Sequence, residues 1–232
     1  MTIELHTWNT PNGRKISVAL EEMGLPYKVF PVNITKGEQM APAFLKISPN
    51  NKIPAIVDPE GPDGRPMSLF ESGAILVYLA GKTGRFLPAD VRGKYVALQW
   101  LMFQMGGVGP MFGQVHHFLR QTKEPVPYAI ERYTKEKDRL YAVLDKRLGE
   151  AEYLAGDEYT IADIAIMPWL RVPANQGVDA ARFPNYRRWF DEIGARPAVQ
   201  RGLAVLSDVK RPPPDDPKWR ENLFGSTQYQ QR

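Results

Sequence analysis

The residues with the clearest chemical potential surround a proline and a helix start in the first third of the chain. Ile53 precedes Pro54, and proline fixes its own φ and keeps the preceding residue extended, ahead of a strand that we expect at Ala55–Asp58. If the bond before Pro54 is cis, the backbone of Ile53 is free to pair with an extended peptide. Glu71 and Ser72 end another strand and begin a helix, whose positive end attracts a carboxylate. The pattern predicts a site for a peptide that carries a carboxylate.

A second pair of polar residues, Thr10 and Asn12, lies in the loop before the first expected helix. Thr and Asn commonly cap helices at such positions, so a purely structural role is the alternative. A hydroxyl or N–H group directed at a sulfur atom would instead stabilise the thiolate and lower the pKa of the thiol. The chain contains no cysteine, which excludes a disulfide framework, a cysteine nucleophile and a thiolate metal site. Any sulfur chemistry must therefore come from a ligand.

Alternating strands and helices position these residues in the N-terminal part. A strand-helix-strand order implies parallel strands joined by a right-handed crossover, and loops at the carboxyl ends of strands, such as residues 8–13, are where open α/β sheets bind ligands. The layout is thioredoxin-like. We expect strands at 3–7, 27–32, 55–58 and 67–70, and helices at 14–23 and 72–81.

Strand signals stop near residue 88, and helical periodicity takes over. Helices are expected at 91–105 and 128–148, with the glycine-rich residues 106–110 as an interruption, and Thr160 and Asp163 have the spacing of a helix-capping box. The fold class is thus α/β plus all-α. The expected organisation is a thioredoxin-like domain at 1–84, an all-helical domain at 92–207, and a C-terminal tail at 208–232 that packs on the body.

Composition narrows the classes of partner. The 232 residues are 43% hydrophobic, enough for a sizeable core. The formal charge of +4 is spread along the chain and intermixed with acidic residues, which argues against a nucleic-acid partner. The N-terminus has no basic and apolar leader pattern, and no stretch is long enough for a membrane span. We expect a cytoplasmic protein with no membrane partner.

Several motifs carry a resemblance to a known family that extends over most of the chain. The motifs are Asn-Lys-Ile-Pro at 51–54 and Glu-Ser-Gly-Ala-Ile at 71–75, with Thr-Pro-Asn-Gly-Arg-Lys-Ile at 10–16, Ser-Pro-Asn-Asn-Lys at 48–52 and Tyr-Ala-Ile-Glu-Arg-Tyr at 128–133. By these motifs the chain resembles the cytosolic glutathione transferases, and within them the nu-class branch of bacterial disulfide-bond reductases.

The resemblance implies glutathione as substrate or co-substrate, a disulfide as second substrate, no metal, and a homodimer. It also implies roles for individual residues. Thr10 and Asn12 would be the catalytic residues that contact the sulfur. The other binding roles fall to Gln39 and Lys52 at the glycine end of glutathione, Ile53 at the cysteinyl backbone, Glu71 and Ser72 at the γ-glutamyl end, and Arg132 at a glutathione carboxylate across a dimer interface.

Two functions from different classes remain open. One is a glutathione-dependent disulfide-bond reductase that uses two bound glutathiones or oxidised glutathione, with weak transferase or peroxidase activity. The other is a non-catalytic, glutathione-binding regulatory protein of the same fold; an Asn/Gln-rich extension that would favour regulation is absent, and the loop at 10–13 is intact. His116 and His117 do not form a metal site in this interpretation, because adjacent residues on a helix do not face the same way.

Overall fold

The computed structural model describes residues 2–171, 173, 177–209 and 216–229, and these form two compact units. The first unit comprises residues 1–75 and 201–232, and the second comprises residues 76–200. The domain limits expected from the sequence, at 84 and 92, remain a prediction.

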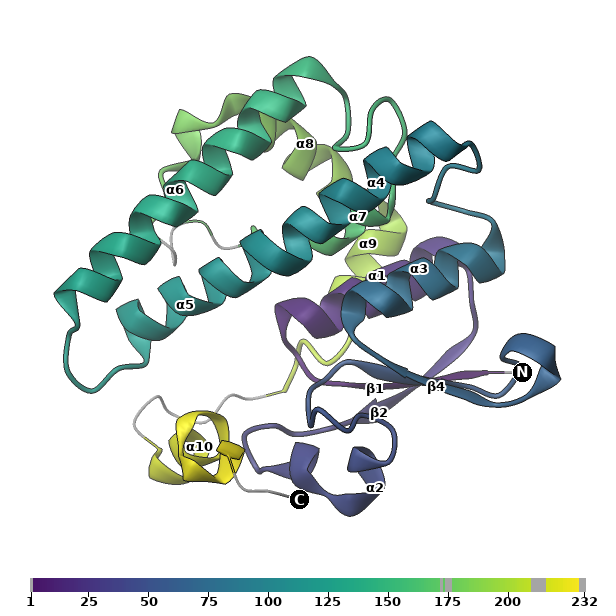
Figure 1. The fold of residues 1–232 in the computed structure, drawn as a ribbon, viewed down its shortest axis with the longest axis horizontal. Helices are drawn as coiled ribbons and strands as arrows, with labels where there is room; N and C mark the ends of the chain where they lie inside the picture. The colour runs from purple at the N-terminus through teal and green to yellow at the C-terminus, as the bar shows by residue number, and fades with distance from the viewer. Residues whose placement is uncertain (1, 172, 174–176, 210–215, 230–232) are drawn as a thin grey trace. The chain divides into compact units, whose positions relative to one another are not determined.

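The first unit is built on a four-stranded sheet with the strand order β2-β1-β3-β4 (Figure 1). Strand β1 pairs in parallel with β2, as the strand-helix-strand order predicts, whereas β3 is antiparallel to both β1 and β4. Helices α1 and α2 lie on opposite sides of this sheet in Figure 1. The strands are β1 (Ile3–Thr7), β2 (Tyr27–Pro31), β3 (Ala55–Asp58) and β4 (Met67–Phe70), and the helices are α1 (Pro11–Met23), α2 (Pro42–Leu45) and α3 (Ser72–Thr83), with 3-10 turns at Glu38–Met40 and Pro62–Gly64.

Apolar side chains at helical and strand spacing form the core of this unit. Leu5, Ile16, Leu20 and Ile56 are each 0% exposed. Helix α1 begins at Pro11, three residues before the expected start, because proline is well tolerated in the first turn, where its missing N–H has no helical partner.

The second unit is helical, and α5 and α6 pack against each other along their lengths (Figure 1). Its helices are α4 (Val91–Phe103), α5 (Gly109–Arg120), α6 (Pro127–Glu150), α7 (Ile161–Ile166) and α8 (Pro184–Gly194), with 3-10 turns at Met167–Trp169 and Ala180–Arg182; α9 (Pro197–Ala204) crosses the limit between the units. The glycine-rich stretch does not break the helix: residues Gln104–Val108 form a π-helical turn that links α4 to α5. Glycine costs only about 1 kcal/mol in a helix, so packing of the neighbouring turns can keep it helical.

A capping box starts α7, as the sequence predicts. The backbone N–H of Thr160 donates to Asp163 at 2.9 Å, and the Thr160 hydroxyl accepts from the N–H of Ala162 at 3.3 Å. Asp163 is fully buried and also accepts from Leu154 N–H at 3.0 Å and from the indole of Trp189 at 2.8 Å. This carboxylate therefore joins three segments of the helical unit.

Candidate functional site

Thr10 is the cap of α1. Its backbone is extended, and its hydroxyl oxygen accepts from the N–H of Gly13 at 3.1 Å. A hydroxyl has one donor and two acceptor sites, so this bond leaves the O–H available to donate to a ligand sulfur. A Cβ on Gly13 would lie 2.3 Å from the carbonyl oxygen of Trp8, so the loop closes on the helix only because this residue is glycine.

Asn12 lies directly after Pro11 in the first turn of the same helix. Thr10 and Asn12 thus share a helix start that carries no acidic side chain in its first turn. The positive end of the helix dipole acts at this point and favours an anion. The structural role and the proposed chemical role of Thr10 are therefore compatible.

Glu71 and Ser72 form a second polar corner, at the start of α3. Glu71 is exposed and has a positive φ of 69°, a left-handed conformation that is uncommon for a residue other than glycine. Such a conformation costs of order 1–3 kcal/mol and persists where the surroundings impose it, often at ligand sites. Ser72 is 4% exposed.

Lys15 connects this corner to α1, and sequence reasoning missed it. Its ammonium group donates to the Ser72 hydroxyl at 3.2 Å, although the two residues are 57 positions apart. Burial lowers the pKa of Lys15 to about 7, and the charge of Glu71 acts in the opposite direction. The available signal was a lysine inside the apolar run of a helix, which by itself does not distinguish a surface position from a buried one.

Gln39 and Lys52 each donate a hydrogen bond to a C-terminal residue of the same unit. Gln39 is 3% exposed, and its amide N–H donates to the backbone carbonyl of Asn222 at 3.3 Å. The ammonium group of Lys52 donates to the side-chain oxygen of Gln228 at 2.9 Å, and desolvation lowers the pKa of Lys52. The sequence contained no sign of these partners.

Ile53 follows Lys52 in the sequence and lies two residues before β3. The bond between Ile53 and Pro54 is cis. The side chain of Ile53 is half-buried against a cluster of Val32, Phe44 and Ala55. This packing fixes the position of the Ile53 backbone, which we expect from the sequence to pair with an extended peptide.

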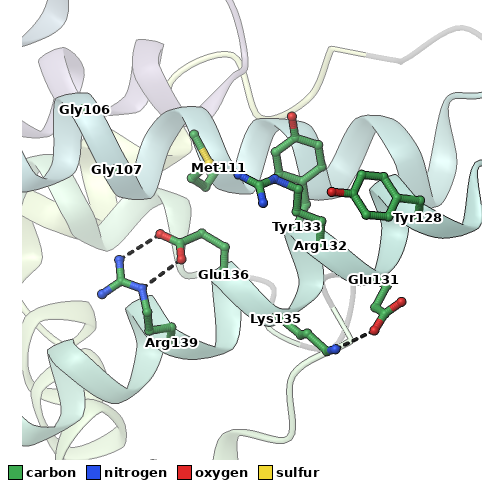
Figure 2. A pocket seen from close by; sticks show the side chains of 10 residues that line it. All are labelled: Gly106, Gly107, Met111, Tyr128, Glu131, Arg132, Tyr133, Lys135, Glu136 and Arg139. Atoms are coloured by element: carbon green, nitrogen blue, oxygen red, sulfur yellow. Dashed lines mark hydrogen bonds and ion pairs between the residues drawn. The ribbon is translucent and has the colours of Figure 1, made fainter.

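Arg132 belongs to the helical unit and lines a cavity of about 710 Å³ between α5 and α6. Figure 2 shows its guanidinium beside Met111 and Tyr133, away from the two ion pairs drawn there. Those pairs join Glu136 to Arg139, with both nitrogen-oxygen distances 2.8 Å, and Glu131 to Lys135. Hydrogen bonds from Arg139 are the main cause of the lowered pKa of Glu136, and the charge of Arg132 contributes less. Within the described part of the chain, no ion pair of Arg132 is found, so its charge is available to an anionic ligand.

The two adjacent histidines have ordinary packing roles on α5. The ring of His116 lies 3.3 Å from the amide nitrogen of Gln121, and His117 packs edge-on against Phe118. Among the residues that the structure describes, no group of three His, Cys, Asp or Glu side chains could hold a metal ion.

The helices of the described chain include none long and apolar enough to cross a membrane.

Comparison with known proteins identifies two family matches. Residues 1–81 match the family described as "Glutathione S-transferase, N-terminal domain", and residues 110–197 match "Glutathione S-transferase, C-terminal domain". The chain is 52% identical to the disulfide-bond oxidoreductase YfcG of Escherichia coli over 211 residues, which cover 90% of this chain and 98% of that protein. It is 39% identical to the disulfide-bond oxidoreductase YghU of the same species, over 88% of this chain and 74% of that protein.

Solved structures of similar proteins contain glutathione. A glutathione transferase from Burkholderia graminis, with two glutathione molecules bound per subunit, is 46% identical with a TM-score of 0.83, and the match covers 90% of each chain. A glutathione transferase from Pseudomonas putida, with one glutathione disulfide per subunit, is 45% identical with a TM-score of 0.83, and the match covers 88% of this chain and 91% of that chain. The thioredoxin-like domain followed by a helical domain, expected from the sequence, is thereby confirmed.

Proposed function

Since the chain belongs to the glutathione S-transferase family, we propose that it is a glutathione-dependent disulfide-bond reductase that binds two glutathiones, or one oxidised glutathione. The observation that carries the proposal is the start of α1, where the Thr10 hydroxyl and Asn12 occupy a positive helix end in a chain without cysteine. The similar structures with two glutathiones or a glutathione disulfide bound support the stoichiometry.

The reaction balances without a protein thiol. A glutathione thiolate attacks one sulfur of the substrate disulfide, forms a mixed disulfide, and releases the first product thiolate. A second glutathione thiolate attacks the glutathione sulfur of the mixed disulfide, which releases the second product thiolate and leaves oxidised glutathione. Three groups stabilise the attacking thiolate by lowering the pKa of its thiol: the Thr10 hydroxyl, the side-chain amide of Asn12 and the dipole of α1.

The binding roles follow the charges at each end of the peptide. Glu71 accepts from the γ-glutamyl ammonium group, and Ser72 with the N–H groups of the α3 start binds the carboxylate beside it. Gln39 and Lys52 bind the glycine carboxylate, and the backbone of Ile53 pairs with the cysteinyl residue. Weak transferase or peroxidase activity would use the same thiolate.

Arg132 contributes to this site from a partner subunit in our proposal, in a homodimer built through the helical unit. Helix α4 exposes an apolar stripe that supports this assembly: Val91 is 73% exposed, Tyr95 65% and Met102 53%. Large exposed apolar side chains that repeat on one helix face at this spacing are consistent with a protein interface. We place the reaction in the cytoplasm, where the glutathione pool is reducing.

The test is glutathione-dependent reduction of a small dialkyl disulfide, coupled to NADPH oxidation by glutathione reductase. Thr10→Val should lower kcat more than it weakens glutathione binding, because the hydroxyl contacts a sulfur whose charge changes during the reaction. Thr10→Ser retains both the hydroxyl and the cap and controls for loss of the methyl group, whereas Thr10→Asn retains a cap acceptor without the hydroxyl and is the control for the cap. Activity of Thr10→Val and Asn12→Ala equal to that of the natural protein would remove this loop from the chemistry, and binding of glutathione without any turnover would favour the non-catalytic alternative.

A further inference from the structure

The last described residues form a small folded segment of their own. Residues 216–229, here the C-terminal segment, comprise α10 (Pro217–Phe224) and a 3-10 turn at Ser226–Tyr229. Asp216 caps α10 by accepting from the N–H of Trp219 at 3.1 Å. The carboxylate of Glu221 then accepts from the Ser226 hydroxyl at 2.9 Å, which joins the helix to the following turn. The segment therefore has local structure that can be presented to a neighbouring surface.

That surface is the corner of the first unit where Gln39 and Lys52 lie. The side-chain amide of Asn222 donates to the carbonyl oxygen of Thr35 at 2.8 Å and anchors the segment. Gly37 lies beside Asn222 with a positive φ of 80°, which favours glycine, and a Cβ there would lie 3.2 Å from the Asn222 side-chain oxygen, closer than an ordinary contact.

Both donors of the corner meet an uncharged oxygen acceptor from the segment. Gln39 donates to the Asn222 carbonyl at 3.3 Å, and Lys52 donates to the Gln228 side-chain oxygen at 2.9 Å. The amide of Gln228 also donates to the Asn222 carbonyl, which ties the two acceptors together. Two linked oxygens that accept from an amide and an ammonium group reproduce the hydrogen-bonding pattern of one carboxylate.

These contacts are weaker than those a carboxylate would make. The Lys52 ammonium group meets only an amide oxygen here, whereas a carboxylate would add the attraction between two opposite charges to the hydrogen bond. The side-chain oxygen of Gln39 is also buried and has no hydrogen-bond partner among the described residues. That oxygen is an acceptor, with which a carboxylate cannot pair, so the case for displacement rests on the Lys52 ammonium group, which meets an opposite charge only when a carboxylate binds.

We propose that the C-terminal segment is a competitive cap on the carboxylate subsite, whose Asn222 and Gln228 oxygens are displaced when the glycine carboxylate of glutathione binds to Gln39 and Lys52. This inference rests on the proposed glutathione site. The cap lowers the affinity for glutathione. It also favours ligands that carry a carboxylate at this position, because an uncharged ligand group would not displace the Asn222 and Gln228 oxygens from Gln39 and Lys52.

Calorimetric titration with glutathione tests the competition. Gln228→Ala removes the acceptor that competes for the Lys52 ammonium group and should tighten glutathione binding by about tenfold or more, the range expected for one hydrogen bond to a charged group. Asn222→Ala removes the anchor to Thr35, a neutral hydrogen bond, and should tighten binding by about threefold to tenfold. Tyr229→Ala changes the adjacent side chain, which is 82% exposed, and should leave the affinity unchanged. Binding of γ-glutamylcysteine, which lacks glycine and does not enter this subsite, should be the same in all variants.

Lys52→Met separates failure of the cap from failure of the site. If it weakens glutathione binding while Gln228→Ala and Asn222→Ala leave it unchanged or weaken it, the subsite stands and the cap is refuted. If Lys52→Met has no effect, both the subsite and the cap are refuted. Hydrogen exchange gives an independent readout: glutathione should speed exchange at residues 218–228 if it displaces the segment, and slower exchange there would show that the segment instead clamps the ligand.

Discussion

Replacing Lys15 with methionine should stabilise the fold at neutral pH and reduce its dependence on pH. Lys15 is 1% exposed, and burial lowers its pKa from the ordinary 10.5 to about 7, although the charge of Glu71 opposes this. Methionine preserves the unbranched shape and removes the charge. The first unit would then no longer bear the cost of desolvating an ammonium group.

The sign of the pH effect follows from proton binding. Below about pH 7 the amine is protonated in both the folded and the unfolded chain, so the folded state bears the full penalty. Between about pH 7 and 10.5 the folded chain has lost this proton and the unfolded chain retains it, so the free energy of unfolding rises with pH. The shift corresponds to a total on the order of 5 kcal/mol at 1.36 kcal/mol per pH unit, with about 3 kcal/mol of it between about pH 6.5 and 9.5.

Urea unfolding followed by circular dichroism at these two pH values measures the effect. Lys15→Met should be more stable than the natural protein at the lower pH, and this advantage should shrink by about 3 kcal/mol at the higher pH, because other titrating groups cancel in the difference. Lys36→Met alters an exposed lysine of the same unit and serves as the control. An advantage that stays constant across this range would refute the assignment of a buried, readily deprotonated amine to Lys15.

Three further predictions concern the helical unit and the ligand corner. Asp163→Ala should lower the free energy of unfolding by about 3 kcal/mol or more, because it leaves buried donors of Leu154, Thr160 and Trp189 without their acceptor; a fall of less than about 1 kcal/mol in urea unfolding would contradict this. Ser72→Ala should weaken glutathione binding in calorimetry by about 1.5–3 kcal/mol, as expected for a charge-assisted hydrogen bond, and it should also lower the free energy of unfolding, because the buried Lys15 loses this acceptor; equal affinity would place the γ-glutamyl end elsewhere. Tyr95→Glu should shift sedimentation from dimer to monomer at micromolar concentration, since it puts a charge into the exposed stripe of α4; a monomeric natural protein would refute the dimer.

Patterns that act over short distances along the chain could be interpreted from the sequence. Strands β1, β3 and β4 have the expected limits, since strand length, proline and turn residues are local signals. The capping box of Thr160 and Asp163 is likewise encoded within four residues. The π-helical turn at Gln104–Val108 was not foreseen, because glycine signals a possible break and only the surrounding packing decides whether the helix continues.

The sequence by itself determined the two-part fold, the helix starts beside Thr10 and Ser72 and, since it has no cysteine, that any thiol in the proposed reaction comes from a ligand. Only the tertiary structure decided that Lys15 is buried against Ser72, 57 positions away, and that Lys52 meets Gln228 across 176 positions. The physical reason is that secondary structure depends on periodicity and caps within a few residues, whereas burial of a charge and the partner of a donor depend on which distant segments pack together.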